Sequence, residues 1–201
     1  SAVSMNYLKE EVLFINLVIP LLVMAWEMYR NSGRPLENIA FSLLGVVYVA
    51  LPFSILNFFF NPDFIPGNYH PGVLMGFFFI LWAYDTFAYL TGILIGRHKL
   101  FERISPKKTW EGTFGGLVFG MAAAWIISIY FTAFSLFEWL IMAVLIMIFG
   151  TFGDLVESMF KRNLKVKDSG SLLPGHGGLL DRFDAVLLAA PAVFVYMILI
   201  H

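Results

Sequence analysis

The hydrophobic positions of this chain fall into long continuous runs instead of alternating with polar ones. Six runs, spanning residues 11–29, 37–60, 71–96, 113–134, 137–160 and 184–200, approach the length that crosses a bilayer, about 20 residues per helix. Lipid offers no hydrogen bonds to a bare backbone, and the runs lack the alternation of barrel strands. The pattern therefore predicts an all-α fold, a polytopic integral membrane bundle of about six transmembrane helices.

The composition points to the same class. Hydrophobic residues make up 59% of the 201 positions, charged residues only 13%, and the mean hydropathy is +0.79. These values lie outside the range of soluble domains. The net charge of −1 gives no reason to expect a nucleic acid partner. Neither an internal repeat nor a low-complexity linker is found, so residues 1–201 are interpreted as a single transmembrane domain.

Basic residues are distributed unevenly over the predicted loops. Twelve of the thirteen Lys and Arg residues follow the first, third and fifth runs. Because short basic loops are retained in the cytoplasm, these loops are predicted to face it, with both termini on the opposite side. The two larger basic loops then share one face and can form one site.

The most polar stretch, Ser158 to Asp184, reads SMFKRNLKVKDSGSLLPGHGGLLDRFD and separates two apolar runs. Asp181 and Asp184 are three residues apart, so a helical turn there points both carboxylates the same way. Together with Asp154 of the preceding run they offer hard oxygen ligands suited to Mg²⁺ or Mn²⁺. Capping of the last helix is an alternative explanation for one of the two acids.

The same stretch also contains candidate phosphate ligands. Gly177 and Gly178 allow a backbone whose N–H groups converge on an anion, and the helix start that follows adds positive potential. His176 is a candidate metal ligand, acid or base, or phosphate donor; a turn-stabilising hydrogen bond is the alternative. The cations available to anionic oxygens are Lys161, Arg162, Lys167 and Arg182, although the positive-inside bias alone accounts for part of this set.

Three further features lie outside that stretch or at its edge. Asp85 falls in the middle of the third run, where inserting an acid into the membrane costs about 2.5–3.5 kcal/mol. This cost favours a functional role; the alternative is a structural carboxylate that accepts hydrogen bonds from Thr or Tyr hydroxyls. Asp154 and Ser158 share a helix face at a spacing of four residues, and Ser158 is a candidate substrate ligand. Lys107 and Lys108, in SPKKTWEG before the fourth run, are placed to meet anionic headgroups of membrane lipids.

These residues resemble a known signature, that of the phosphatidate cytidylyltransferases, also called CDP-diacylglycerol synthases. The matching positions are Ser158, Lys161, Arg162, Lys167, Asp168, Gly170, Leu173, Pro174, His176, Gly177, Gly178, Asp181, Arg182 and Asp184. The stretches DTFAYLTG around Asp85 and SPKKTWEG are also similar to recurring stretches of that family. The resemblance thus covers roughly residues 80–190.

The resemblance implies transfer of a cytidylyl group from CTP to phosphatidic acid, giving CDP-diacylglycerol and pyrophosphate with a divalent metal. It implies a multi-pass homodimer of the cell inner membrane, whose active site we expect to face the cytoplasm. Members generally carry more N-terminal spans, so either this chain is a compact member or N-terminal or loop residues of the protein lie outside this sequence.

Residue roles follow from combining this chemistry with the pattern. Asp154, Asp181 and Asp184 are assigned to the metal. Lys161, Arg162, Lys167, Arg182 and the His176 loop are assigned to the CTP phosphates and the leaving group. Lys107 and Lys108 are assigned to the phosphatidate headgroup or the phosphate cage, and Asp85 to orienting a cation or the lysines.

Three further hypotheses concern an additional ion and two other classes of function. A monovalent cation such as K⁺ beside Mg²⁺ is one, because clustered carboxylates facing a polyphosphate need more neutralisation than one ion gives. An ion- or proton-coupled transporter, with Asp85 and Asp154 as relay carboxylates, is another, but its paired broken helices in two related halves are not found. A CDP-alcohol phosphotransferase would need a different spacing of Asp, Gly and Arg, which is also not found.

Overall fold

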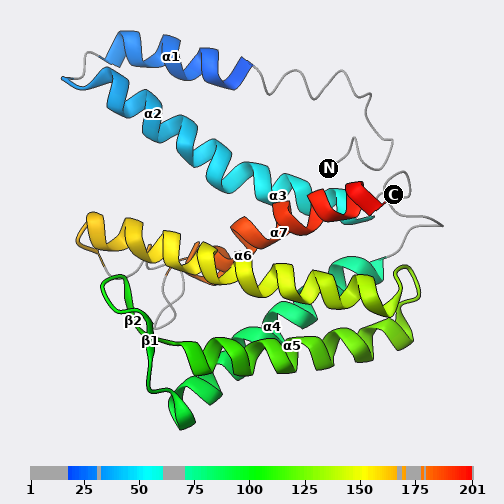
Figure 1. Cartoon of the computed structure of the whole chain (residues 1–201). Coiled ribbons are helices and arrows are strands. Elements are labelled where there is room, and N and C mark those ends of the chain that lie inside the picture. The colour runs from blue at the N-terminus through cyan, green and yellow to red at the C-terminus, as the bar shows by residue number, and fades with distance from the viewer. Residues whose placement is uncertain are drawn as a thin grey trace.

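A computed structural model of the chain describes residues 18–30, 33–60, 71–166, 169–170, 178 and 180–200. These residues are mainly helical, with one two-stranded hairpin (Figure 1). The elements are α1 (Val18–Arg30), α2 (Pro35–Gly45), a π-helical segment (Val46–Ala50), α3 (Leu51–Leu56), a 3-10 turn (Asn57–Phe60), α4 (Pro71–Ile95), β1 (Lys99–Phe101), β2 (Ser105–Thr109), α5 (Trp110–Tyr130), α6 (Leu136–Asn163) and α7 (Leu180–Ile200).

Five helical segments are long and apolar enough to cross a membrane, which confirms the prediction of a helical membrane protein. They are Pro35–Phe59, Pro71–Ile95, Trp110–Tyr130, Leu136–Asn163 and Leu180–Ile200. The run predicted at 11–29 lies partly outside the described residues. Its described part is α1, which has 13 residues, so a sixth span stays a prediction.

Local capping sets where two of the spans begin. The hydroxyl of Thr109 accepts a hydrogen bond from the Gly112 amide at 3.2 Å, so α5 begins at Trp110 instead of near residue 113. Ser135 and Glu138 form a reciprocal capping box at the start of α6, with the Glu138 carboxylate 2.6 Å from the Ser135 amide.

The second span is interrupted where proline enters it. Pro52 has no N–H to donate, and the π-helical segment Val46–Ala50 lies directly before α3. This segment carries Tyr48, whose ring meets that of Phe160 on α6 edge-on, with centroids 5.5 Å apart. The interruption thus directs an aromatic side chain toward α6.

Helices α4 to α7 form the packed part of the bundle, where α4–α5 and α6–α7 make the most extensive helix pairs (Figure 1). Its fully buried side chains include Phe77, Ile80, Trp139, Ile146, Val193 and Met197. Small residues allow the helices to approach closely: a Cβ on Gly116 of α5 would lie 2.7 Å from the Tyr84 carbonyl oxygen.

The loop between α4 and α5 is a β-hairpin, which the sequence pattern did not predict. Lys99 pairs with Thr109 and Phe101 with Ser105 in antiparallel register. The Glu111 carboxylate fastens the base of the hairpin by accepting hydrogen bonds from the amides of Arg97 and His98, at 3.1 and 3.2 Å. In Figure 1 the hairpin lies at the same end of the bundle as the end of α6, so two basic regions are brought together.

Candidate active site

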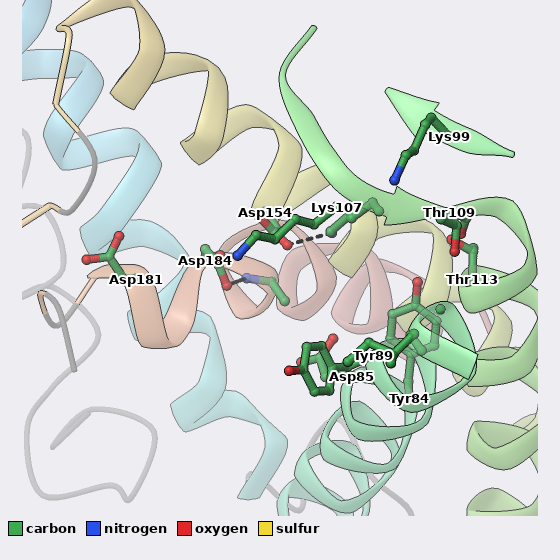
Figure 2. A pocket seen from close by; sticks show the side chains of 15 residues that line it. Tyr84, Asp85, Tyr89, Lys99, Lys107, Thr109, Thr113, Asp154, Asp181 and Asp184 are labelled. Carbon is green, nitrogen blue, oxygen red and sulfur yellow. Dashed lines mark hydrogen bonds and ion pairs between the residues drawn. The ribbon is translucent and has the colours of Figure 1, made fainter. Parts of the chain in front are cut away.

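A cavity of about 650 Å³ lies where α4, the hairpin, α5, α6 and α7 meet (Figure 2). This volume is in the range of small-molecule sites. The cavity is lined by Tyr84, Asp85, Ala88, Tyr89, Gly92, Ile93, Lys99, Lys107, Lys108, Thr109, Thr113, Asp154, Asp181, Asp184 and Ala185. Charged side chains from distant parts of the sequence therefore share one space beside apolar residues of α4.

Four carboxylates reach this cavity, and the sequence pattern had singled out all of them. Asp85 comes from α4, Asp154 from α6, and Asp181 and Asp184 from the first turns of α7. Figure 2 shows Asp154 and Asp184 on adjacent helices, with Asp181 one turn earlier on α7. The charge of Asp85 interacts with those of Lys108 and Asp154, so the mid-span acid belongs to the same electrostatic group.

Three lysines of the hairpin face these acids. Lys108 Nζ lies 2.6 Å from Asp154 Oδ2, and the Lys108 side chain is 25% exposed. Lys99 and Lys107 line the same cavity. Lys107 and Lys108 were candidates from the sequence, whereas Lys99 was not. No sequence pattern indicated it, because Lys99 reaches the site through its strand pairing with Thr109, the residue that directly follows the two other lysines.

Asp154 is held by two partners. Lys108 contacts one carboxylate oxygen, and the Ser158 hydroxyl donates to the other, Oδ1, at 3.2 Å. Ser158 was a candidate substrate ligand, but it does not line the cavity. Its hydrogen bond orients Asp154, one helical turn away on the same face.

Asp181 accepts four hydrogen bonds from described groups. They come from Lys161 Nζ at 2.7 Å, the Ser169 amide at 2.9 Å, the Ser169 hydroxyl at 2.8 Å and the Gly178 amide at 2.7 Å. Gly178 was a candidate phosphate ligand, but its amide here donates to a protein carboxylate. Asp181 thus joins the start of α7 to both sides of the polar stretch.

Lys161 does not line the cavity. Besides Asp181, its ammonium contacts Glu157 Oε2 at 3.1 Å, and the Lys161 side chain is 19% exposed. Glu157, whose side chain is only 1% exposed, was not among the candidates from the sequence. Its signal was the spacing, since Glu followed four residues later by Lys is a favourable helical pair.

Asp184 has a simpler environment. Its Oδ1 accepts a hydrogen bond from the Ala185 amide at 2.6 Å, and its charge interacts with those of Asp154 and Asp85. Among the described residues, no group of three His, Cys, Asp or Glu side chains is gathered so as to hold a metal ion. Asp154 and Asp184 nevertheless present hard oxygens to one cavity. Mg²⁺ is often held by one or two carboxylates together with substrate phosphates, and this donor set fits that mode.

The remaining candidates divide into two groups. Arg162 and Arg182 are exposed and do not line the cavity. Lys167, His176 and Gly177 lie outside the described residues.

A buried hydrogen bond joins one lining residue of the cavity to α6. Tyr84 lines the cavity from α4, and its hydroxyl lies 2.5 Å from the Thr151 hydroxyl on α6. Neither residue was a candidate from the sequence. The bond holds α4 and α6 together one turn from Asp154.

The chain is similar to known proteins along most of its length. A model of the cytidylyltransferase family matches residues 2–200. The chain is 38% identical over 179 residues to proteins named phosphatidate cytidylyltransferase from Staphylococcus haemolyticus and Staphylococcus aureus, and 36% identical to that of Staphylococcus saprophyticus. Each alignment covers 88% of this chain and 66% of the relative, so the chain spans about two thirds of the length of these relatives.

Proposed function

Because this chain belongs to the cytidylyltransferase family, we propose that it transfers the cytidylyl group of CTP to phosphatidic acid. The observation that carries the proposal is the cavity in which four carboxylates face three lysines at one end of a membrane-spanning bundle. Both substrates are phosphate anions, and one of them is a lipid. A charged cavity walled partly by the membrane helix α4 suits such a pair.

The reaction is an in-line displacement. A phosphate oxygen of phosphatidic acid forms a bond to the α-phosphorus of CTP, the bond between that phosphorus and the β-phosphate oxygen breaks, and pyrophosphate leaves with the electron pair. CDP-diacylglycerol is the other product. Positioning and charge neutralisation provide most of the catalysis in phosphoryl transfer, so no covalent enzyme intermediate is needed.

The lysines of the hairpin supply positive charge where the phosphates meet. Lys107 and Lys108 neutralise phosphate oxygens as point charges, and Lys99 adds a third cation on the same side of the cavity. Lys108 also keeps Asp154 in place through their ion pair. Asp85, deeper in α4, attracts these ammonium groups toward the cavity.

A divalent cation, Mg²⁺ or Mn²⁺, belongs to this proposal. Asp154 and Asp184 would hold it, and Asp181 would add charge from the edge of the cavity. When bound, such a cation neutralises developing negative charge on the phosphates. Two acids of the cavity support a bound divalent cation. Among the described residues, no Lys or Arg forms an ion pair with Asp85 or Asp184, so their negative charge is left for a metal ion. The same excess of negative charge supports a monovalent cation such as K⁺ beside it.

We further propose that the active site faces the cytoplasm in the cell inner membrane and that the enzyme is a homodimer. The grouping of basic loops at one end, together with the positive-inside rule, supports the orientation. Labelling of a single cysteine introduced at Arg103 in sealed vesicles tests it: a membrane-impermeant reagent should react only from the cytoplasmic side.

The activity itself is tested with purified protein in detergent. Pyrophosphate release should require CTP, phosphatidic acid and Mg²⁺ together, and should fall to background when ATP replaces CTP or when EDTA is added. Organic-soluble CDP-diacylglycerol should form in equal amount. Substrate flux into liposomes without nucleotide hydrolysis would support the transporter instead, and an absence of pyrophosphate release would refute the transferase.

A further inference from the structure

The carboxylate of Glu157 is one of the least accessible charges in the described part of the protein. It lies on α6, three residues after Asp154, with a side chain that is 1% exposed. One of its oxygens contacts Lys161, and the other, Oε1, has no hydrogen-bond partner among the described residues. A buried carboxylate is costly unless it is paired, so a role for this one is expected.

That role is indicated by what Lys161 contacts. Its ammonium lies between Glu157 Oε2 at 3.1 Å and Asp181 Oδ1 at 2.7 Å, so one cation bridges a carboxylate of α6 and one of α7. A lysine held by two carboxylates has little freedom to follow a substrate phosphate. Lys161 also does not line the cavity.

Asp181 connects Lys161 to the backbone of the polar stretch. Its second oxygen, Oδ2, accepts hydrogen bonds from the amides of Ser169 and Gly178, at 2.9 and 2.7 Å. Those two amides lie on either side of residues that the family signature contains. The chain Glu157–Lys161–Asp181 therefore connects the inside of α6 to the backbone of the polar stretch.

We propose that Glu157 and Lys161 are positioning residues, which set the place of Asp181 at the edge of the cavity and do not bind the phosphates of CTP. The proposal rests on the proposed function for its kinetic test. Glu157 acts on Asp181 through Lys161, whose ammonium contacts both carboxylates. This assigns Lys161 a different role from that expected on sequence grounds.

The kinetic test is a double-mutant cycle of Glu157→Gln, Lys161→Met and both together. We expect each single variant to lower kcat by about 10²-fold, as small misplacements of a reacting group do, with an unchanged KM for CTP. The double variant should lose no more than Lys161→Met alone. Multiplying losses, or a KM for CTP raised by Lys161→Met while Glu157→Gln behaves as wild type, would overturn the proposal.

A second measurement does not depend on activity. Hydrogen exchange of the Ser169 and Gly178 amides should accelerate in Glu157→Gln and in Lys161→Met, because Asp181 then holds them less firmly. Unchanged exchange in both variants contradicts the proposal. If Lys161→Met does not fold, Lys161→Gln replaces it in both experiments.

The matched control is Glu27→Gln. Glu27 is also a buried helical carboxylate, 5% exposed in its side chain, and pairs with Arg30 at 3.6 Å on α1, away from the cavity. This variant should keep wild-type kcat and wild-type exchange of the Gly178 amide. If the wild-type protein lacks CTP-dependent activity, the proposed function fails, while the exchange experiment still decides the positioning role.

Discussion

The ammonium of Lys108 lies 2.6 Å from a carboxylate oxygen of Asp154, and this ion pair joins the β1–β2 hairpin to α6. Lys108 precedes α5 by two residues, and Asp154 lies in the second half of α6. The pair therefore holds the hairpin lysines over the acids of the cavity. It also occupies one of the oxygens that a divalent cation would use.

Replacing Lys108 by Met should lower kcat/KM by about 10²–10³-fold, comparable to the loss of one preorganised charge at a transition state. The variant removes a cavity cation and leaves Asp154 with Ser158 as its remaining partner among the described residues. Steady-state formation of CDP-diacylglycerol measures the effect. The control is Arg103→Gln, an exposed hairpin residue outside the cavity lining, which should retain full activity. Full activity of Lys108→Met would remove the lysine from the site.

Replacing Asp184 by Asn should raise the Mg²⁺ concentration needed for half-maximal activity and lower kcat. The change removes one ligand charge with little change of shape, and the amide keeps an oxygen that can accept from the Ala185 amide. Activity measured across a Mg²⁺ titration reports both quantities. Glu102→Gln, in the exposed turn of the hairpin, is the matched loss of a negative charge. An unaltered Mg²⁺ dependence of Asp184→Asn would exclude this residue as a metal ligand.

Gly153 and Gly150 lie on the same helix and offer a sharp comparison. A Cβ on Gly153 would collide with the Asp184 carbonyl oxygen and lie 3.1 Å from the Ala185 Cα, whereas one on Gly150 would lie 3.4 Å from a Leu81 methyl group, an ordinary contact. Gly153→Ala should therefore push α7 away, displace Asp184 and lower both activity and melting temperature. Gly150→Ala should be tolerated on both measures. Wild-type activity and melting temperature of Gly153→Ala would show that α7 can shift without effect.

The buried pair Tyr84 and Thr151 predicts a change in stability. Tyr84→Phe should destabilise the protein by about 1 kcal/mol, because the Thr151 hydroxyl then loses its partner between α4 and α6. Denaturant unfolding in detergent measures this. Adding Thr151→Val to the Tyr84→Phe variant should recover part of the loss, since both polar groups are then gone. A further additive loss in the double variant would contradict the pairing.

The sequence predicted much of the bundle and of the charged site. Long apolar runs determine helices in lipid, so the bounds of α4 were predicted to within one residue. Asp85 stood out because a charge within a span is costly, and the structure brings it to the same cavity as Asp154. These conclusions depend on local composition and spacing, which a single sequence displays.

Other features depend on contacts between distant segments. The strand Ser105–Thr109 contains a proline and two adjacent lysines, with no alternation to reveal it, so the hairpin and the place of Lys99 were missed. Lys161 was expected at the CTP phosphates because it is a basic residue in a polar stretch. The sequence does not show that Glu157 and Asp181 both contact its ammonium in the folded protein. The predicted roles of Lys167, His176 and Gly177 stay predictions.

The junction of β2 and α5 has a thermodynamic consequence for catalysis. β2 ends at Thr109 and α5 begins at the next residue, so Lys107 and Lys108 sit on backbone that is ordered by a strand pairing on one side and a membrane helix on the other. Ordering the backbone costs about 1–2 kcal/mol of conformational entropy per residue. At Lys107 and Lys108 this cost is part of folding, so substrate binding does not add it again. CTP and phosphatidic acid then need to immobilise only side chains, which leaves more of their binding free energy for affinity.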